Sequence, residues 1–405
     1  MDTYHRNLFA VTAASFIGFT GFTLVMPFLP LYFQVLGVTD VGQIAMWSGL
    51  SLGVTPALTA MLAPLWGRLA DRYGRKIMVV RSLVSFVIVM SAMAFVTRAW
   101  HVFALRAVQG LFAGYGALTL TMAADSAPRD RMAYAIGVVQ TAQRLGPAIG
   151  PILGGTIAQM VGMRNTFLVT ACFYFVAVML VIFLYREPPA HRADDDENGG
   201  RVSFRNVLAF ENFILLMGVV FGLQFVDRSF GPILPLYVTE LGTPHDRVAL
   251  VSGILFSIAA GAGAVGHHSC GRLLRRLNAR VVIAGSATVG AMGAVIYVLA
   301  GSAWLLLLGT PIFGIAIGVA TTAAYTAASS VMPGTARGAG FGLLTTASLT
   351  GLALSPIVSG ILGATSIRAV FILDVVALAA LAVFVSRLMI STPLPETTAP
   401  ATEEL

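Results

Sequence analysis

Long apolar stretches separated by short polar loops run through almost the whole chain. A helix needs about 20 mostly apolar residues to cross the hydrocarbon core of a bilayer. Twelve stretches meet this criterion, and they lie near 8–34, 44–66, 77–97, 101–124, 133–160, 165–185, 210–236, 248–267, 281–300, 303–329, 338–361 and 367–389. The first is too long for the core of a signal peptide, so we expect it to be retained. The pattern predicts an all-α membrane protein with twelve transmembrane helices.

The composition agrees with a membrane protein. Of the 405 residues 57% are hydrophobic and only 11% are charged, whereas soluble domains carry about 25% charged residues. The net charge of +7 comes from basic residues in short loops, and a nucleic-acid-binding protein would gather them on one soluble face. We therefore expect a lipid bilayer as the partner and no nucleic acid. The two cysteines, Cys172 and Cys270, are too few for a disulfide framework.

The distribution of Arg and Lys predicts the orientation. Eighteen of these residues fall on the side of the N-terminus. Only four fall on the other side, namely Arg98, Arg164, Arg247 and Arg368. Because cytoplasmic loops are rich in Arg and Lys, we expect both termini in the cytoplasm. The preference for Arg over Lys is typical of GC-rich bacteria, which favours a bacterial inner membrane.

A polar stretch over 187–209 divides the spans six and six. It holds Pro188, Pro189 and an acidic run at 194–197, and reads as a cytoplasmic linker. The expected domains are a six-helix bundle over 1–186, this linker, a second bundle over 210–390 and a tail over 391–405. Two motifs of the first half recur in the second half. The loop after the second span recurs after the eighth span at an offset of 204 residues, and the glycine pattern of the fifth span recurs in the eleventh at an offset of 205 residues. Duplicated halves are typical of transporters whose site lies between them.

The loop after the second span carries the most specific motif. Its sequence is Gly67-Arg68-Leu69-Ala70-Asp71-Arg72-Tyr73-Gly74-Arg75-Lys76. The two glycines permit a tight turn. Asp71 lies beside several guanidinium groups, from which it can accept charge-assisted hydrogen bonds, and it can also interact with a helix N-terminus. In the second-half copy Arg275 replaces Asp71 and Asn278 replaces Gly74, so a symmetric second loop of this kind is not expected.

This loop resembles the signature loop of the major facilitator superfamily, and the resemblance covers the whole chain. It implies two pseudo-symmetric six-helix bundles. It also implies that the loop is a conformational latch, with Asp125 and Arg131 as companions. The implied latch residues are Gly67, Asp71, Arg72, Gly74, Arg75, Lys76, Asp125 and Arg131. The alternative is a basic loop that only sets the topology.

A second motif places Arg106 inside the fourth span, in Leu105-Arg106-Ala107-Val108-Gln109-Gly110. An Arg at mid-span costs about 2.5–3.5 kcal/mol on insertion scales, so it is expected to face the interior and have a partner. In similar proteins an Arg here couples to proton movement. The alternative is a structural Arg bonded to backbone carbonyls or to Gln109. Gly110 and Gly114 form a small-xxx-small pair that we expect to serve close packing.

A third motif, in the fifth span, consists of Gly137, Gly146, Gly150, Pro151, Gly154 and Gly155. Three of these glycines form a stripe at four-residue spacing that lets a neighbouring helix approach closely, and Pro151 can bend the helix. The spacing resembles the antiporter motif of drug-exporting members. The alternative is ordinary packing of a Gly-rich helix. Met26-Pro27-Phe28-Leu29-Pro30 in the first span further resembles an element of twelve-span drug:proton antiporters. The longer stretch Leu24–Tyr32, together with Met46-Trp47-Ser48-Gly49, resembles the MdtG-type branch of enterobacterial multidrug exporters.

Ionisable residues inside the spans are few. A carboxylate in a low-dielectric site binds its proton more tightly than in water, which suits a proton carrier. Asp227 is the first candidate and Asp374 the second, each with a structural ion pair as the alternative. Arg228 points about 100° away from Asp227 around the helix, so no pair between them is required. We expect the substrate cavity to be lined by Gln109, Gln140, Arg144, Gln224 and Arg228.

These features predict a proton-coupled secondary antiporter that exports small amphiphilic compounds by alternating access. The partners are then a small-molecule substrate and protons, and we expect a monomer without cofactor. No acid lies between Asp2 and Asp40 in the first span, which favours a neutral, zwitterionic or anionic substrate over a permanent cation. The alternative is an importer of nutrients or metabolites with the same fold. An enzyme is not expected, because no catalytic triad or paired carboxylates occur. His267 and His268 lack further ligands at metal-binding spacing.

Overall fold

A computed structural model describes residues 3–128, 131–187, 208, 210–333 and 337–390. All regular elements in these ranges are helices. The expected linker over 187–209, apart from Glu187 and Leu208, and the expected tail over 391–405 lie outside the described residues or at their edge.

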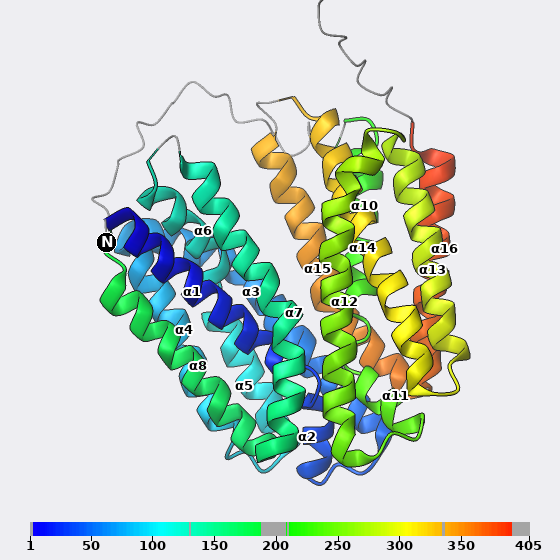
Figure 1. The fold of residues 1–405 in the computed structure, drawn as a ribbon, viewed down its shortest axis with the longest axis horizontal. Coiled ribbons are helices and arrows are strands. Elements are labelled where there is room, and N and C mark those ends of the chain that lie inside the picture. Colours follow the sequence, from blue (N-terminus) through cyan, green and yellow to red (C-terminus); the bar gives the residue numbers. More distant parts are fainter. Residues whose placement is uncertain (1–2, 129–130, 188–207, 209, 334–336, 391–405) are drawn as a thin grey trace, which may run out of the picture.

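The first half of the chain forms one bundle (Figure 1). Its helices are α1 (Thr3–Leu24), α2 (Leu29–Val35), α3 (Val41–Tyr73), α4 (Arg75–Met93), α5 (Ala99–Phe112), α6 (Tyr115–Ser126), α7 (Met132–Val161) and α8 (Met163–Leu184). The second half forms the other bundle. Its helices are α10 (Phe213–Arg228), α11 (Leu234–Glu240), α12 (His245–Leu274), α13 (Ala279–Leu299), α14 (Ala303–Val331), α15 (Arg337–Gly363) and α16 (Ile367–Leu388).

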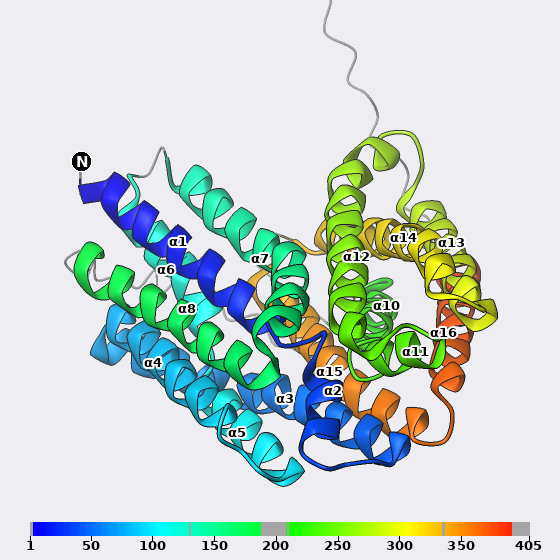
Figure 2. The same ribbon diagram turned by 60° about the horizontal axis from the view of Figure 1, so that its bottom comes forward.

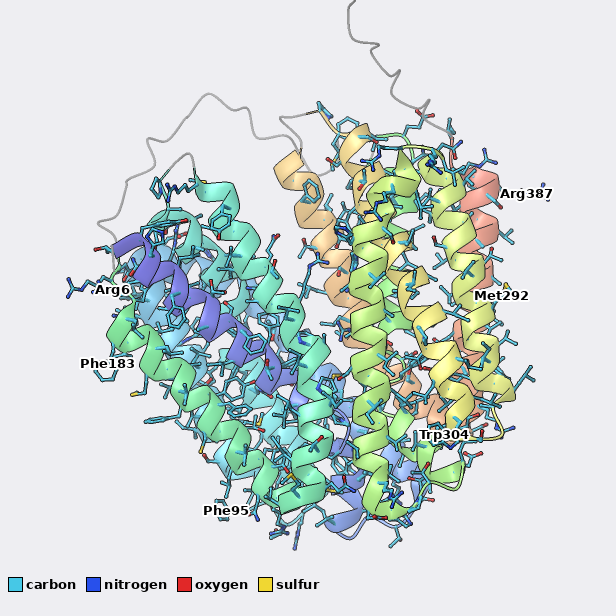
Figure 3. The ribbon with its side chains drawn as sticks, viewed as in Figure 1. Arg6, Phe95, Phe183, Met292, Trp304 and Arg387 are labelled. Atoms are coloured by element: carbon cyan, nitrogen blue, oxygen red, sulfur yellow. The ribbon has the colours of Figure 1, made fainter. Side chains whose placement is uncertain are left out.

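Ten helical segments of the described chain are long and apolar enough to cross a membrane. The helix α7 and the broken pair α10 and α11 complete the twelve expected spans. Large apolar side chains such as Phe183 and Met292 point outward and are 75% and 64% exposed (Figure 3), as expected where lipid replaces water. The predicted fold, an all-α membrane protein with two six-helix bundles, is therefore confirmed.

Three of the expected spans are not continuous, which corrects the prediction of unbroken helices. Pro30 and Pro235 lie in the first turns of the short helices α2 and α11. There the missing N–H of proline leaves no hydrogen bond unmade. Gly114 has φ +119° between α5 and α6, a backbone conformation that favours glycine. Gly114 thus breaks the span, and only Gly110 serves the close packing that the spacing predicted, against the backbone of Thr55.

Two asparagines tie the first and last helices of each bundle in the same way. The side chain of Asn7 donates to the carbonyl oxygen of Arg186 at 2.7 Å and accepts from its N–H at 2.9 Å. Asn212 makes the same two bonds to Ile390, both at 3.0 Å. The two ties are offset by 205 and 204 residues. The duplication therefore extends to individual hydrogen bonds.

Two buried tyrosines repeat a second hydrogen bond. Tyr32 donates to the carbonyl oxygen of Met93 at 2.7 Å, and Tyr237 donates to that of Tyr297 at 2.6 Å. Each tyrosine stands in a Leu-Pro-Leu-Tyr sequence at the start of a short helix. The bond joins the broken first span of each half to the third span.

The two bundles meet closely at only one end, which we call the seal. In the seal α3 packs against α15 and α12 packs against α7, as both views show (Figures 1 and 2). A Cβ atom on Gly49 would overlap the carbonyl oxygen of Pro356, and one on Gly253 would overlap that of Pro151. The two contacts are related by the offsets of 204 and 205 residues. Only glycine therefore allows this close approach at both places.

The start of α1 and the end of α16 lie at the end of the molecule opposite the seal, which we call the terminal end. Arg6 and Arg387 mark this side, and Phe95 and Trp304 mark the side of the seal (Figure 3). Toward the terminal end the bundles diverge (Figure 1). Gly67, Gly137, Gly261 and Gly342, which lie in the halves of their helices nearer this end, have no neighbouring atom within 4 Å of an added Cβ.

Candidate functional site

A cavity of about 520 Å³ lies between the two bundles. Its walls come from α1, α3, α5 and α7 of the first half and from α10, α12, α14 and α15 of the second half. Pro151 and Pro356 of the seal are part of its lining. The cavity is thus bounded on one side by the seal, and its size suits a drug-sized molecule.

Much of the cavity wall is apolar. Phe19 and Phe22 of α1 and Met26 in the turn after it form one side, and Phe256 of α12 and Ile317 of α14 form another. Aromatic rings and a flexible Met side chain adapt to apolar bodies of different shape. This wall favours an amphiphilic ligand over a fully polar one.

Asp227 and Arg228 of α10 lie in the cavity wall and form an ion pair. The distance from Arg228 Nε to Asp227 Oδ2 is 3.2 Å, and the two side chains are 34% and 35% exposed. Sequence spacing did not require this pair. The long Arg228 side chain spans the angle between neighbouring positions of the helix, because a low-dielectric wall favours a paired charge.

Arg106 is almost fully buried behind the cavity surface. It is 2% exposed and contributes to the lining. Its Nη1 donates to Gln109 Oε1 at 2.9 Å. Its Nε and Nη2 have no hydrogen-bond partner among the described residues. The structure therefore provides the interior position and the Gln109 contact that the sequence predicted, but no counter-ion.

Three of the five residues expected in the cavity line it: Arg144, Gln224 and Arg228. Gln109 does not, because it is fully buried one turn beyond Arg106. Gln140 does not either. It lies one turn nearer the terminal end than Arg144, where the bundles diverge, and its side chain is exposed.

Asp374 lies apart from the cavity. It is fully buried in α16, and its Oδ2 accepts a hydrogen bond of 2.6 Å from the Oγ of Ser229, the residue that follows α10. Its Oδ1 has no partner within the described chain. Phe230 and Phe371, which contact each other nearby, add apolar surroundings. The structure thus separates the two candidate acids into one that faces the cavity and one between helices.

His267 is a cavity residue that sequence analysis passed over. Its Nδ1 lies 2.7 Å from Thr322 Oγ1 of α14, and its side chain lines the cavity. The span containing it was predicted to end at 267, but α12 continues to Leu274. Phe256, Gly263 and His267 all lie within the predicted span 248–267, and their spacing already places all three on one face of the helix.

The latch loop turns at Gly74, whose φ is +96°. Arg75 forms an ion pair with Asp125 of α6, which brings together two of the residues that the resemblance implied. Arg131 follows at the start of α7. Asp71 is exposed near the end of α3, which continues past it to Tyr73, and it has no ion-pair partner among the described residues. Its role in the latch stays a prediction.

Glu187 takes the position at the helix N-terminus that had been expected for Asp71. Its Oε1 accepts from the backbone N–H of Arg75 at 2.7 Å, at the start of α4. A carboxylate is favourable there because it offsets the positive end of the helix dipole. Lys76 Nζ donates to the carbonyl oxygens of Ile182 and Tyr185, at 2.9 and 2.7 Å. The loop therefore ties α3 and α4 to the end of α8. The second-half copy instead uses Asn278, whose Oδ1 accepts from Val281 N–H at 3.0 Å.

The antiporter motif packs α7 against two helices. Added Cβ atoms on Gly146, Gly150 and Gly154 would all overlap α1, between Phe19 and Leu24. An added Cβ on Gly155 would overlap the carbonyl oxygen of Ala249 in α12. The close helix approach predicted from the stripe is therefore present. Gly137, the first glycine of the motif, has no such neighbour.

Comparison with known proteins agrees with this architecture. The family model described as Major Facilitator Superfamily matches residues 11–333 and 269–405. The chain is 34% identical over 270 residues to "Multi-drug resistance efflux pump PmrA homolog" of Lactococcus lactis subsp. lactis, covering 67% of this chain and 66% of that protein. It is 36% identical over 282 residues to "Multidrug resistance protein MdtG" of Yersinia enterocolitica, covering 69% and 68%. These alignments span about two thirds of each relative's length.

Solved structures support the fold alone. A bacterial homologue of the human lysosomal transporter Spinster, inward-facing and occupied, superposes with a TM-score of 0.80 at 16% identity and covers 96% of this chain and 98% of that one. A D-xylose-proton symporter superposes with a TM-score of 0.76 at 14% identity, with the same coverage.

Proposed function

Because the chain belongs to the Major Facilitator Superfamily and is therefore a multi-pass membrane transporter, we propose that it exports small amphiphilic compounds in exchange for protons. The observation that carries the proposal is the cavity between the halves. It combines an apolar wall with an acid, Asp227, and is closed at one end by a seal that includes the antiporter motif. The names of the relatives, multidrug efflux proteins, support drug export.

The direction of export follows from the proposed orientation. With the Arg-rich terminal end in the cytoplasm of a bacterial cell, the seal faces outward. The structure then corresponds to the state that accepts substrate from inside. We propose that the halves rock until the seal opens and the terminal end closes. Asp71, exposed at the end of α3, would then be available for contact with the second half, as its latch role requires.

Asp227 is the proposed proton carrier. Its ion pair with Arg228 exists only while Asp227 is charged, so protonation releases Arg228. Proton binding drives the cycle if the outward-open state holds the proton better than the state described here. Substrate and proton then occupy opposite conformations and need not share atoms. The whole cavity comes from one chain, so we propose a monomer as the working unit.

Inside-out membrane vesicles with an acidified lumen and a pH-sensitive dye provide the test. A panel of neutral, anionic and cationic amphiphiles is added from outside. We expect some of these compounds to dissipate the gradient in vesicles with the transporter and not in vesicles without it. Asp227→Asn should abolish the response.

The matched control is Asp246→Asn. Asp246 also pairs with the Arg that follows it, Arg247, at 3.9 Å, but this pair is exposed at the start of α12 and outside the cavity. The control should respond like the wild type. Gradient loss that persists unchanged in Asp227→Asn would remove this acid from the mechanism. Proton-driven accumulation of a compound on the cytoplasmic face would indicate an importer instead.

A further inference from the structure

The charges that line the cavity are unevenly divided between its two halves. The second half contributes Asp227 and Arg228, which neutralise each other at 3.2 Å. The first half contributes Arg106 and Arg144. Neither has an ion-pair partner among the described residues. With His267 neutral, the cavity lining has a net charge of +2.

Among the described residues of the first half, no acid pairs with these arginines. Its described acids all lie at helix ends or in loops. Asp40 caps α3 by accepting from Gln43 N–H at 2.8 Å. Asp125 pairs with Arg75, and Glu187 caps α4. Asp71 is exposed near the end of α3. The described acids of the first half therefore leave the charges of Arg106 and Arg144 without a counter-ion.

Burial makes Arg106 the stronger of the two sites. A guanidinium group removed from water needs compensation by a counter-ion or by hydrogen bonds. Arg106 has one side-chain hydrogen bond, to Gln109, while Nε and Nη2 have none. Thr55 Oγ1 donates to the Arg106 backbone carbonyl at 2.9 Å and holds this segment of α5 against α3. Nε and Nη2 are the two donors that a carboxylate binds bidentately. They are buried just behind the cavity surface, so an anion reaches them once the Arg106 side chain or its neighbours shift slightly.

We propose that Arg106 and Arg144 bind the acidic group of the exported compound, which is an amphiphile with a carboxylate on an apolar body. The apolar body packs against Phe19, Phe22 and Phe256 in the same cavity. This inference rests on the proposed function, whose substrate class it narrows. It also predicts that the Asp227–Arg228 pair stays intact when the anion binds.

The test measures binding without a proton gradient. Purified full-length protein is placed in nanodiscs of a zwitterionic lipid, and the probe is a dansyl-labelled fatty carboxylate, with its methyl ester as the uncharged match. Empty nanodiscs correct for partition into lipid. We expect the carboxylate to bind about tenfold or more tightly than the ester, because a charge-assisted bond to a desolvated Arg is stronger than a neutral one.

Variants assign the effect to residues. Arg106→Gln should lower the affinity for the carboxylate about tenfold and leave that for the ester unchanged. Arg144→Gln should lower it less. Arg81→Gln is the control, because Arg81 is a partly buried arginine that stacks on Trp66 at 3.4 Å, outside the cavity. It should bind like the wild type.

Equal affinity of the wild type for carboxylate and ester overturns the proposal, as does an Arg106→Gln variant with unchanged carboxylate binding. If Arg106→Gln does not fold, the proposal is decided by the affinities of the wild type for carboxylate and ester and by the carboxylate affinity of Arg144→Gln. Failure of this inference is distinguishable from failure of the proposed function. Tight carboxylate binding with no gradient loss in the vesicles contradicts export and keeps the anion site. Gradient loss with neutral or cationic compounds alone contradicts the anion site and keeps export.

Discussion

The two halves of the molecule share the hydrogen bonds and glycine contacts that hold their helices together, but they do not share their buried ionisable side chains. The asparagine ties, the tyrosine bonds and the glycine contacts of the seal all recur at offsets of 204 or 205 residues. The buried charges do not recur. The first half buries Arg106 beside the cavity, and the second half buries Asp374 between helices. Rocking of two bundles requires matched contacts, whereas recognition of a ligand requires only one copy of each charged group.

The two buried charges also differ in what they lack. Arg106 keeps a hydrogen bond to Gln109, lines the cavity and has two buried donors without a partner among the described residues. Asp374 keeps a hydrogen bond to Ser229 and does not line the cavity. The difference supports the proposal that Arg106 binds a ligand and that Asp374 has a structural role.

The largest effect is expected from breaking the symmetric seal. Gly49→Val and Gly253→Val each place a side chain on a carbonyl oxygen of the other half. Overpacking costs about 1–3 kcal/mol, so the sealed state loses population by about tenfold or more. The measurement is the rate at which an impermeant thiol reagent, added on the side of the seal, labels a cysteine at Leu52 after Cys172 and Cys270 are replaced by Ser.

The two glycine variants should raise this rate alike. Gly261→Val in α12 is the control, because an added Cβ there meets no atom within 4 Å. A large effect of only one of the two seal variants would contradict the equivalence of the halves.

Asp374→Asn sharpens the contrast between the two acids. The amide can still accept from Ser229, and Asp374 lies outside the cavity, so we expect export to stay within about twofold of the wild type. This is a small change for an isosteric substitution away from a functional site. The measurement is the vesicle assay, beside Asp227→Asn. A complete loss of export in Asp374→Asn, with export retained in Asp227→Asn, would show that Asp374 and not Asp227 is the proton carrier.

Asn7→Ala and Asn212→Ala test the ties between first and last helices. Each removes two hydrogen bonds to a backbone N–H and C=O, and leaving such groups unpaired costs about 1–3 kcal/mol. Both should lower the melting temperature of the purified protein, Asn7→Ala more because Asn7 is the more buried of the two. Asn165→Ala removes one exposed bond, from Asn165 in α8 to the carbonyl oxygen of Val161 at the end of α7, and should change little. An unchanged melting temperature in both tie variants would show that the repeated bonds add nothing to stability.

The smallest effect on thermal stability is expected from Tyr32→Phe and Tyr237→Phe. Each loses a buried hydroxyl that donates across the bundle, worth about 1 kcal/mol, and keeps its ring packing. Thermal unfolding should show a small and similar loss, with exposed Tyr73→Phe as control. A larger loss of stability in Tyr237→Phe would show that the two bonds are not equivalent, because Tyr237 also donates to the carbonyl oxygen of Ala300 at 3.2 Å.

Sequence alone determined the spans, the two-bundle fold and the glycine stripe of α7, because these depend on local properties. Hydropathy reports the solvent that each segment meets, and helical spacing reports which residues share a face. The same local rules placed Arg106 in the interior with Gln109 one turn away. They also identified Arg144, Gln224 and Arg228 as cavity residues.

Only the tertiary structure decided the partners of the polar side chains. Glu187 caps α4 in place of Asp71, Asp227 pairs with Arg228, and Asp374 turns away from the cavity. The partners of Glu187 and Asp374 depend on which distant helix lies opposite, and the pair of Asp227 with its neighbour depends on the side-chain conformation of Arg228. Neither hydropathy nor spacing contains that information. A charge in a low-dielectric interior takes the partner that packing brings within reach. For Arg106 packing brings only the side chain of Gln109, and the two donors that stay unpartnered among the described residues are those that we propose for a ligand.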